Sequence, residues 1–137
     1  MDAKNKPARE PLVSIVDDDS SVRRSTWRLL SSSGLRVETY ASAEDFLRLA
    51  KLEKTSCLLL DLSLPGMSGL DLQKHLAQSG LRIPIVFLTA RGGEEDERRA
   101  LRAGANSFLR KPVGEEALLH AIRAALASSA SSPHPGE

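Results

Sequence analysis

Side chains that could bind a cation and carry a reactive carboxylate follow four separate apolar runs of this sequence. Three acids in a row, Asp17–Asp19, come directly after the first run, and Asp61 ends another. Thr89 ends a third run, and Lys111 follows a fourth. Crowded carboxylates repel one another and need a cation, and oxygen ligands without His or Cys favour Mg²⁺, with Mn²⁺ as the alternative. A carboxylate can attack phosphorus, while an ammonium and a hydroxyl stabilise the transferring phosphoryl group.

The elements that must position these residues are predicted from the alternation of short apolar runs with longer amphipathic segments. Strands without polar alternation are typical of a parallel sheet that is covered on both faces, and right-handed crossovers then favour a doubly wound α/β fold. The carboxyl ends of such strands gather at one edge, so the polar residues that follow them should converge there. The predicted strands are 12–16, 35–40, 56–61, 83–89 and 107–109, and the predicted helices are 21–33, 42–52, 70–78, 94–103 and 113–127.

Local signals predict where some helices begin and which sides they bury. Ser42 has the residue type of an N-cap, and Asp45 follows three positions later, as in a capping box. Gly34 ends the first helix, since glycine adopts the left-handed conformation at little cost. The inward-facing residues predicted for the first two helices are Val22, Trp27, Leu29 and Leu30, then Phe46, Leu47, Leu49 and Ala50.

Composition and length set the limits of the interpretation. The 137 residues fit one domain, which we place at 11–127 between a flexible N-terminal segment, 1–10, and a flexible tail or linker, 128–137. A net charge of +1 and 4% aromatic residues give no indication of binding to nucleic acid or to a membrane surface. No signal-peptide pattern or membrane-spanning run is present, and Cys57, the single cysteine, lies in an apolar run, so we expect a cytoplasmic protein.

Four stretches of the sequence resemble the receiver domains of bacterial two-component response regulators, and the resemblance covers residues 11–127. Residues 37–47 are similar to receivers of the LuxR/FixJ type. The resemblance implies a flavodoxin-like (CheY-like) five-stranded parallel sheet in the order 2-1-3-4-5, with helices on both faces. The four stretches are Ile15-Val16-Asp17-Asp18-Asp19, Leu60-Asp61-Leu62-Ser63-Leu64-Pro65-Gly66-Met67-Ser68-Gly69, Phe87-Leu88-Thr89-Ala90 and Phe108-Leu109-Arg110-Lys111-Pro112.

The resemblance also implies a phosphorylation site built around Mg²⁺. Asp61 matches the phosphoacceptor of the family. Asp17 and Asp18 match its acidic pair, with Asp18 favoured over Asp17 as the direct metal ligand. Ser63 lies where the family uses a backbone carbonyl as a further ligand of the ion. The expected metal ligands are therefore Asp17, Asp18, Asp61 and the carbonyl of Ser63.

Further positions match the catalytic and switch residues of the family. Thr89 and Lys111 match the hydroxyl and the lysine that contact the phosphoryl group. Thr89 and Phe108 match the two switch residues, so that phosphorylation would draw Thr89 inward and let Phe108 rotate. The Lys111–Pro112 peptide is expected to be cis, and Arg91 occupies a variable position that can alter the rate of dephosphorylation.

The function implied is that of a signalling phosphoacceptor, which catalyses only its own phosphorylation and dephosphorylation and is not an enzyme in the usual sense. A histidine kinase or phosphotransfer protein would supply the phosphoryl group. The surface formed by helix 4, strand 5 and helix 5 would then bind a downstream protein or an output domain, with transcription as a candidate output. A phosphorylation-dependent dimer is a further hypothesis, and the chain is either a stand-alone regulator or part of a longer protein.

Three alternatives remain open at this stage. Asp17–Asp19 also fits the signature of haloacid-dehalogenase-like phosphatases, in which Asp17 would be the nucleophile and Asp19 the acid/base. The chain could instead be a pseudo-receiver, an interaction module that is never phosphorylated. The acids could also simply favour the start of a helix through its dipole. A basic patch of Arg98, Arg99, Arg102 and Arg110 is interpreted as solvated surface.

Overall fold

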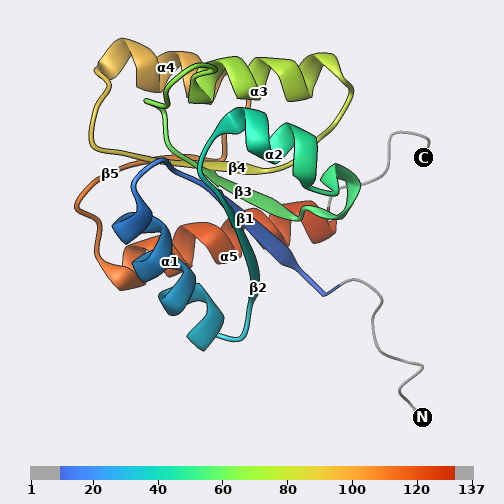
Figure 1. Cartoon of the computed structure of the whole chain (residues 1–137), viewed down its shortest axis with the longest axis vertical. Helices are drawn as coiled ribbons and strands as arrows, with labels where there is room; N and C mark the ends of the chain where they lie inside the picture. The colour runs from blue at the N-terminus through green and yellow to red at the C-terminus, as the bar shows by residue number, and fades with distance from the viewer. Residues whose placement is uncertain (1–9, 132–137) are drawn as a thin grey trace.

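Five parallel strands form the centre of the computed structural model, which describes residues 10–131 (Figure 1). They lie in the order β2-β1-β3-β4-β5, which confirms the predicted topology. The strands are β1 (Leu12–Val16), β2 (Arg36–Tyr40), β3 (Cys57–Leu60), β4 (Ile85–Thr89) and β5 (Ser107–Arg110). The helices are α1 (Ser20–Ser32), α2 (Ala43–Leu49), the short 3₁₀ helix η2 (Leu52–Lys54), α3 (Gly69–Gln78), α4 (Glu94–Arg102) and α5 (Glu115–Ser131).

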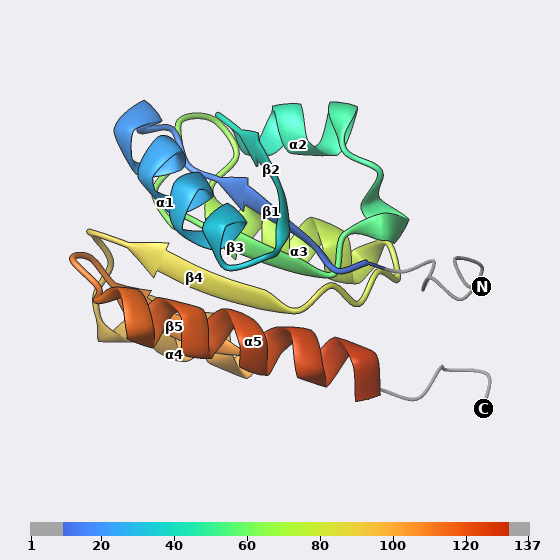
Figure 2. The same cartoon turned by 90° about the horizontal axis from the view of Figure 1, so that it is seen from below.

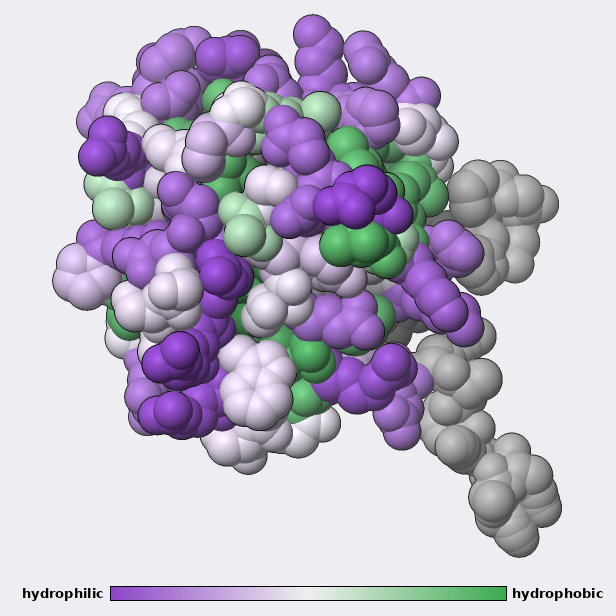
Figure 3. Space-filling view, viewed as in Figure 1, coloured by the Kyte–Doolittle hydropathy of each residue, from purple (hydrophilic) through white to green (hydrophobic). Residues whose placement is uncertain are grey.

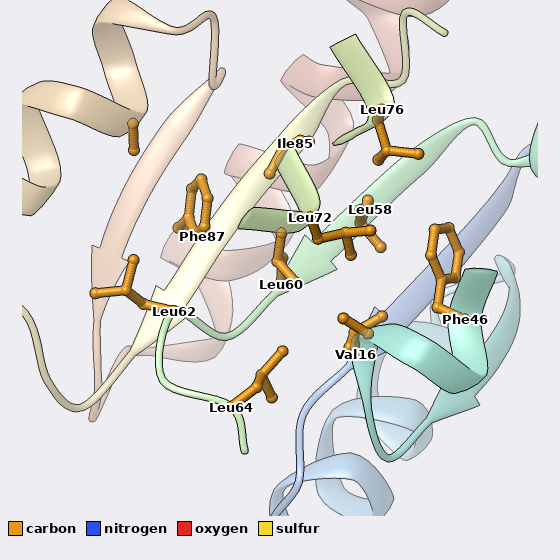
Figure 4. Packing of buried hydrophobic residues seen from close by; sticks show 12 residues of the cluster. Val16, Phe46, Leu58, Leu60, Leu62, Leu64, Leu72, Leu76, Ile85 and Phe87 are labelled. Atoms are coloured by element: carbon orange, nitrogen blue, oxygen red, sulfur yellow. The ribbon is translucent and has the colours of Figure 1, made fainter. Parts of the chain in front are cut away.

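The helices cover both faces of the sheet, with α1 and α5 on one side and α2, α3 and α4 on the other (Figures 1 and 2). The three central strands, β1, β3 and β4, are buried along their whole length, as expected for unbroken apolar runs in a doubly covered sheet. Figure 4 shows how Phe46 of α2 and Leu72 and Leu76 of α3 point onto the strands around Leu58. Because two apolar cores share the same strands, the carboxyl edge of the sheet is held from both sides.

Short polar side chains fix the starts of three helices. The Asp19 carboxylate accepts hydrogen bonds from the backbone N–H groups of Ser21 and Val22 and so caps α1. Ser42 caps α2, as predicted, through a bond from the N–H of Asp45. The complete capping box belongs to α3, where Ser68 and Asp71 bond to each other's backbone, and the sequence interpretation did not identify it.

Several predicted boundaries and facings are wrong. The predicted helix 42–52 ends at Leu49, because Ala50 takes an extended backbone conformation and the chain then forms η2. Strand β4 starts at Ile85, two residues later than predicted. The carbonyl of Pro84 accepts a hydrogen bond from the N–H of Leu58, but proline has no N–H with which to continue the pairing. Trp27 and Leu49, which were expected to face inward, are 47% and 59% exposed.

The carboxyl-terminal helix extends beyond its predicted end. It continues through Ser131, so residues 128–131 of the predicted tail are helical. Residues 1–9 and 132–137, which make up the rest of the predicted flexible segments, lie outside the described residues. Within residues 10–131, no helix has the length and apolar character needed to cross a membrane.

Apolar side chains reach the surface only in scattered places. The face drawn in Figure 3 is mostly hydrophilic, with small separate apolar areas, one of which lies near α2 and the 3₁₀ helix after it. The large apolar side chains that are exposed among the described residues are Trp27, Leu49 and Leu101. The single cysteine, Cys57, is fully buried in β3 as predicted, and burial raises the pKa of its thiol to about 12.

Candidate functional site

The predicted polar residues converge at the carboxyl edge of the sheet, where they line an open depression of about 930 Å³. Lys111 connects two of its acids. Its Nζ lies 2.8 Å from Oδ2 of Asp17 and 3.6 Å from Oδ2 of Asp61. Thr89 also lines the depression and is 1% exposed. The structure therefore brings together one ammonium, one hydroxyl and the acids of two loops, as the sequence predicted.

Backbone pairing places each of these side chains. The N–H of Asp17 donates to the carbonyl of Tyr40 at 3.1 Å, and that of Asp61 donates to Val16 at 3.0 Å. The N–H of Lys111 donates to the carbonyl of Thr89 at 2.9 Å, directly after β5. Each side chain thus continues the hydrogen-bonding pattern of the sheet and starts from a rigid position. The Lys111–Pro112 peptide is cis, as expected.

Three carboxylates form a cluster in which each offers an oxygen within 4.8 Å of the others. They belong to Asp17, Asp18 and Asp61. Asp17 and Asp61 are buried, whereas Asp18 is exposed at the mouth of the depression. Asp19, the third acid of the run, is used to cap α1 instead, and its hydrogen bonds with Ser21 and Val22 lower its pKa. The dipole interpretation of the acidic run therefore holds for Asp19.

The charges of the site oppose one another. Burial, together with the neighbouring charge of Asp17, raises the pKa of Asp61, although Lys111 and Thr89 act in the other direction. Burial disfavours the charge of Lys111 as well, but its hydrogen bond and Coulomb attraction to Asp17 and its attraction to Asp61 outweigh this and raise its pKa. The lysine stays protonated at neutral pH, and its ammonium stands beside the carboxyl groups of Asp17 and Asp61.

The loop between β3 and α3 carries Ser63 along the rim of the site. Its neighbours Leu62 and Leu64 are buried, and Figure 4 shows both side chains in the core cluster. Ser63 itself is exposed, and its N–H donates to Oδ1 of Asp61 at 3.3 Å. The hydroxyl of Thr89 accepts a hydrogen bond from the N–H of Arg91 at 3.2 Å.

Phe108 lies on β5, half-buried beside the core. Its ring centroid is 5.7 Å from that of Phe87, and the guanidinium of Arg110 lies 5.1 Å above the ring. Arg110 also donates to the carbonyl of Gly92 at 2.6 Å and to Glu97 at 3.0 Å. This arginine therefore joins β5 to the β4–α4 loop and to α4. The sequence interpretation had treated it as solvated surface.

Arg23 makes a second contact with the site that the sequence interpretation did not identify. Its Nη1 donates to the carbonyl of Asp17 at 2.7 Å and so restrains the acidic loop from α1. Arg23 lies in the first turns of α1, six residues after Asp17, and its long side chain reaches back to that carbonyl. In the patch of arginines on α4 and β5, Arg98 forms an ion pair with Glu95 and Arg110 forms one with Glu97, so these two charges are partly neutralised.

Open α/β sheets bind their ligands at the carboxyl ends of the strands, where the strand order reverses, and the polar groups of this chain lie there. Residues 13–123 match the family model of the response regulator receiver domain, and the chain belongs to that family. It is a signalling phosphoacceptor domain, and neither the phosphatase nor the pseudo-receiver interpretation is favoured.

Individual relatives agree with this membership. The chain is 45% identical over 114 residues to nodulation protein W of Bradyrhizobium diazoefficiens, a match that covers 83% of this chain and 50% of the relative. It is 38% identical to transcriptional regulatory protein FixJ of Azorhizobium caulinodans, over 86% of this chain and 56% of the relative. The structure of response regulator StyR superposes with a TM-score of 0.83 at 47% identity, over 88% of this chain and 61% of that one. The chain thus spans about half the length of these curated relatives.

Proposed function

We propose that Asp61 accepts a phosphoryl group from a phosphohistidine of a histidine kinase or a phosphotransfer protein. A carboxylate oxygen of Asp61 forms the new O–P bond while the N–P bond to histidine breaks. The electron pair of that bond stays on the imidazole nitrogen, which takes its proton from solvent. The observation that carries the proposal is the position of Asp61, which is buried at the floor of an open depression within 3.6 Å of the Lys111 ammonium.

The acidic cluster fits a divalent cation. Three carboxylates each offer an oxygen within 4.8 Å of the others, and these oxygens are hard ligands that suit Mg²⁺. The residues that would hold the ion are Asp17, Asp18, Asp61 and the backbone carbonyl of Ser63. Bound there, Mg²⁺ would supply positive charge that the phosphoryl oxygens need in the transition state.

Lys111 and Thr89 complete the proposed chemistry. Lys111 is held between two carboxylates by its ion pair with Asp17, so its ammonium is already in place before a phosphoryl group arrives. Thr89 is buried at the end of β4, and its hydroxyl can donate to a phosphoryl oxygen while it still accepts from Arg91. Both groups would stabilise charge that develops on the transferred group.

The same groups support a conformational switch. Phosphorylation changes the charge at Asp61 from −1 to roughly −1.5 to −2. Movement of Thr89 toward the new oxygens would open space for Phe108, which is half-buried at the edge of the core. The surface of α4, β5 and α5 would then change shape and favour a downstream protein, an output domain or a second copy of the chain. Regulation of transcription is the proposed output, since the relatives include a named transcriptional regulator.

The phosphoacceptor assignment is tested by mass spectrometry after incubation with acetyl phosphate and Mg²⁺. The wild-type chain should gain one phosphoryl group, and Asp61→Asn should gain none. Asp45→Asn, which removes a half-buried acid of α2 outside the acidic cluster, is the matched control and should label normally. Labelling that survives Asp61→Asn but disappears in Asp17→Asn would favour the phosphatase mechanism, and no Mg²⁺-dependent labelling of the wild type would favour a pseudo-receiver.

A further inference from the structure

An acid outside the cluster contacts the loop that carries Ser63. Glu44 lies in the first turn of α2, and its Oε2 accepts a hydrogen bond from the N–H of Met67 at 2.8 Å. The two residues are 23 positions apart, so the bond ties α2 to the tip of the β3–α3 loop. Among the described residues, no Lys or Arg forms an ion pair with Glu44. The hydrogen bond that its carboxylate accepts is the one from the backbone of the loop.

The shape of the loop tip agrees with this contact. Gly66, directly before Met67, has a φ of +74°, a conformation that favours glycine. A Cβ at this position would lie 2.5 Å from Oε2 of Glu44. The carboxylate therefore lies directly against the turn, and a side chain at residue 66 would require it to move.

The base of the same loop is held in a different way. Leu62 and Leu64 anchor it in the core, and the N–H of Gly69 donates to the carbonyl of Leu62 at 2.9 Å. Ser63 lies between the two leucines. The base is thus fixed by apolar packing, and Glu44 adds a hydrogen bond from α2 to a tip whose Met67 side chain packs partly against the core.

We propose that Glu44 is a positioning residue for cation binding, acting through the β3–α3 loop and without touching the ion. The inference rests on the proposed function, in which the Ser63 carbonyl is a ligand of Mg²⁺. Met67 at the tip packs only partly against the core, so a hydrogen bond from α2 further restrains the tip and lowers the entropic cost of presenting that carbonyl. Loss of Glu44 should therefore weaken Mg²⁺ binding while leaving the phosphoryl-transfer step intact at saturating Mg²⁺.

The test compares Glu44→Ala, which removes the acceptor, with Glu44→Gln, whose side-chain carbonyl can still accept from Met67. Glu53→Ala is the control, because it removes an equally exposed acid from the neighbouring η2 segment. Three quantities are measured on the whole chain. They are Mg²⁺ affinity by calorimetry, amide exchange at Met67 by NMR, and the rate of labelling by acetyl phosphate as a function of Mg²⁺ concentration.

We expect Glu44→Ala to weaken Mg²⁺ binding about threefold to tenfold, because the contact is charge-assisted but exposed to solvent. Exchange at Met67 should accelerate, the Mg²⁺ concentration for half-maximal labelling should rise by the same factor, and the maximal rate should stay within about twofold. Glu44→Gln should restore most of the affinity, and Glu53→Ala should match the wild type.

Two results would overturn the inference. Equal losses in Glu44→Ala and Glu44→Gln would show that only the charge matters. Unchanged Mg²⁺ affinity with a lower thermal stability would show a purely structural contact. If Glu44→Ala does not fold, Glu44→Asp, which keeps the charge but shortens the side chain by one methylene, takes its place. Failure of the wild-type chain to bind Mg²⁺ or to label is a separate outcome that would contradict the proposed function itself.

Discussion

At the scale of single residues, the Asp61 carboxyl group illustrates how a reactive site costs stability. Its pKa is raised, because burial and the charge of Asp17 both disfavour the carboxylate in the folded state. The unfolded chain lacks this penalty, so the folded state is destabilised wherever Asp61 is ionised. The penalty is present above the folded-state pKa and disappears as the pH falls toward the ordinary value of 3.8.

Asp61→Asn should therefore stabilise the metal-free chain at neutral pH, by about 1 kcal/mol given that the site is open to solvent. The free energy of unfolding is measured with urea for variant and wild type in the presence of a chelator. The difference between them should shrink as the pH is lowered toward 3.8. A difference that stays constant with pH, or a variant that is less stable at neutral pH, would contradict this account of the charge.

Ser14 gives a second prediction at this scale. It is fully buried in β1, and within the described chain its hydroxyl makes no hydrogen bond. An orphaned hydroxyl in the core costs free energy, so Ser14→Ala should raise the free energy of unfolding by about 1 kcal/mol. The control is Ser56→Ala, which removes an acceptor used by the N–H of Leu12 at 3.1 Å and should destabilise the chain. Denaturant unfolding separates the two, and a destabilised Ser14→Ala would count against the argument.

At the scale of the elements, the apolar pattern predicts the strands better than the facing of the helices. The central strands are short, mainly apolar runs without polar alternation, each bounded by polar or turn residues. In α1, the inward stripe passes through Val22, Thr26 and Leu30, which are four residues apart. Trp27 follows Thr26 directly, so its side chain is rotated by about 100° away from this stripe and faces solvent. Its apolar character therefore led to a wrong prediction. Thr26 is buried in its place.

The site was predictable to the extent that the backbone positions it. Asp61, Thr89 and Lys111 come directly after parallel strands, and the topology alone brings their positions together. The contacts of Arg23 and Arg110 depend on which way a long, flexible side chain turns, and no local pattern determines that. The end of α2 at Leu49 could not be predicted either, because the residues that follow include good helix formers. The chain leaves the helix there because it must turn back toward β3, which is a requirement of the tertiary structure.

Arg110 leads to a prediction about the β4–α4 loop. It holds the loop through the carbonyl of Gly92, pairs with Glu97 and covers the ring of Phe108. Arg110→Ala should accelerate amide exchange in that loop, at Arg91 and Gly93, and lower the free energy of unfolding by about 1 kcal/mol.

Arg110→Lys is the matched control for this loop. It keeps the charge but loses the planar fork, so its exchange rates should fall between those of the wild type and Arg110→Ala. Exchange rates at Arg91 and Gly93 that do not change in Arg110→Ala would show that the β4–α4 loop is held without the arginine.

At the scale of the whole molecule, the sheet couples the site to the stability of the fold. The cores on its two faces share strands β1, β3 and β4, and the acids of the site follow two of these strands. A domain of this size with shared strands is expected to unfold as one cooperative unit. A ligand that binds the folded acidic cluster should therefore raise the stability of the entire chain, including α5, which lies on the face opposite to α2.

Mg²⁺ should raise the free energy of unfolding by RT ln(1 + [Mg²⁺]/Kd), about 2.7 kcal/mol at a concentration of 100 times Kd. The measurement is thermal unfolding, followed by circular dichroism, over a series of Mg²⁺ concentrations at constant ionic strength. The double variant Asp17→Asn/Asp61→Asn should show almost no dependence on Mg²⁺, because two of the three clustered carboxylates are lost. Glu53→Ala should follow the wild-type curve. A double variant that gains as much stability from Mg²⁺ as the wild type would place the ion elsewhere, since the stabilisation would then not need the carboxylates beside Lys111.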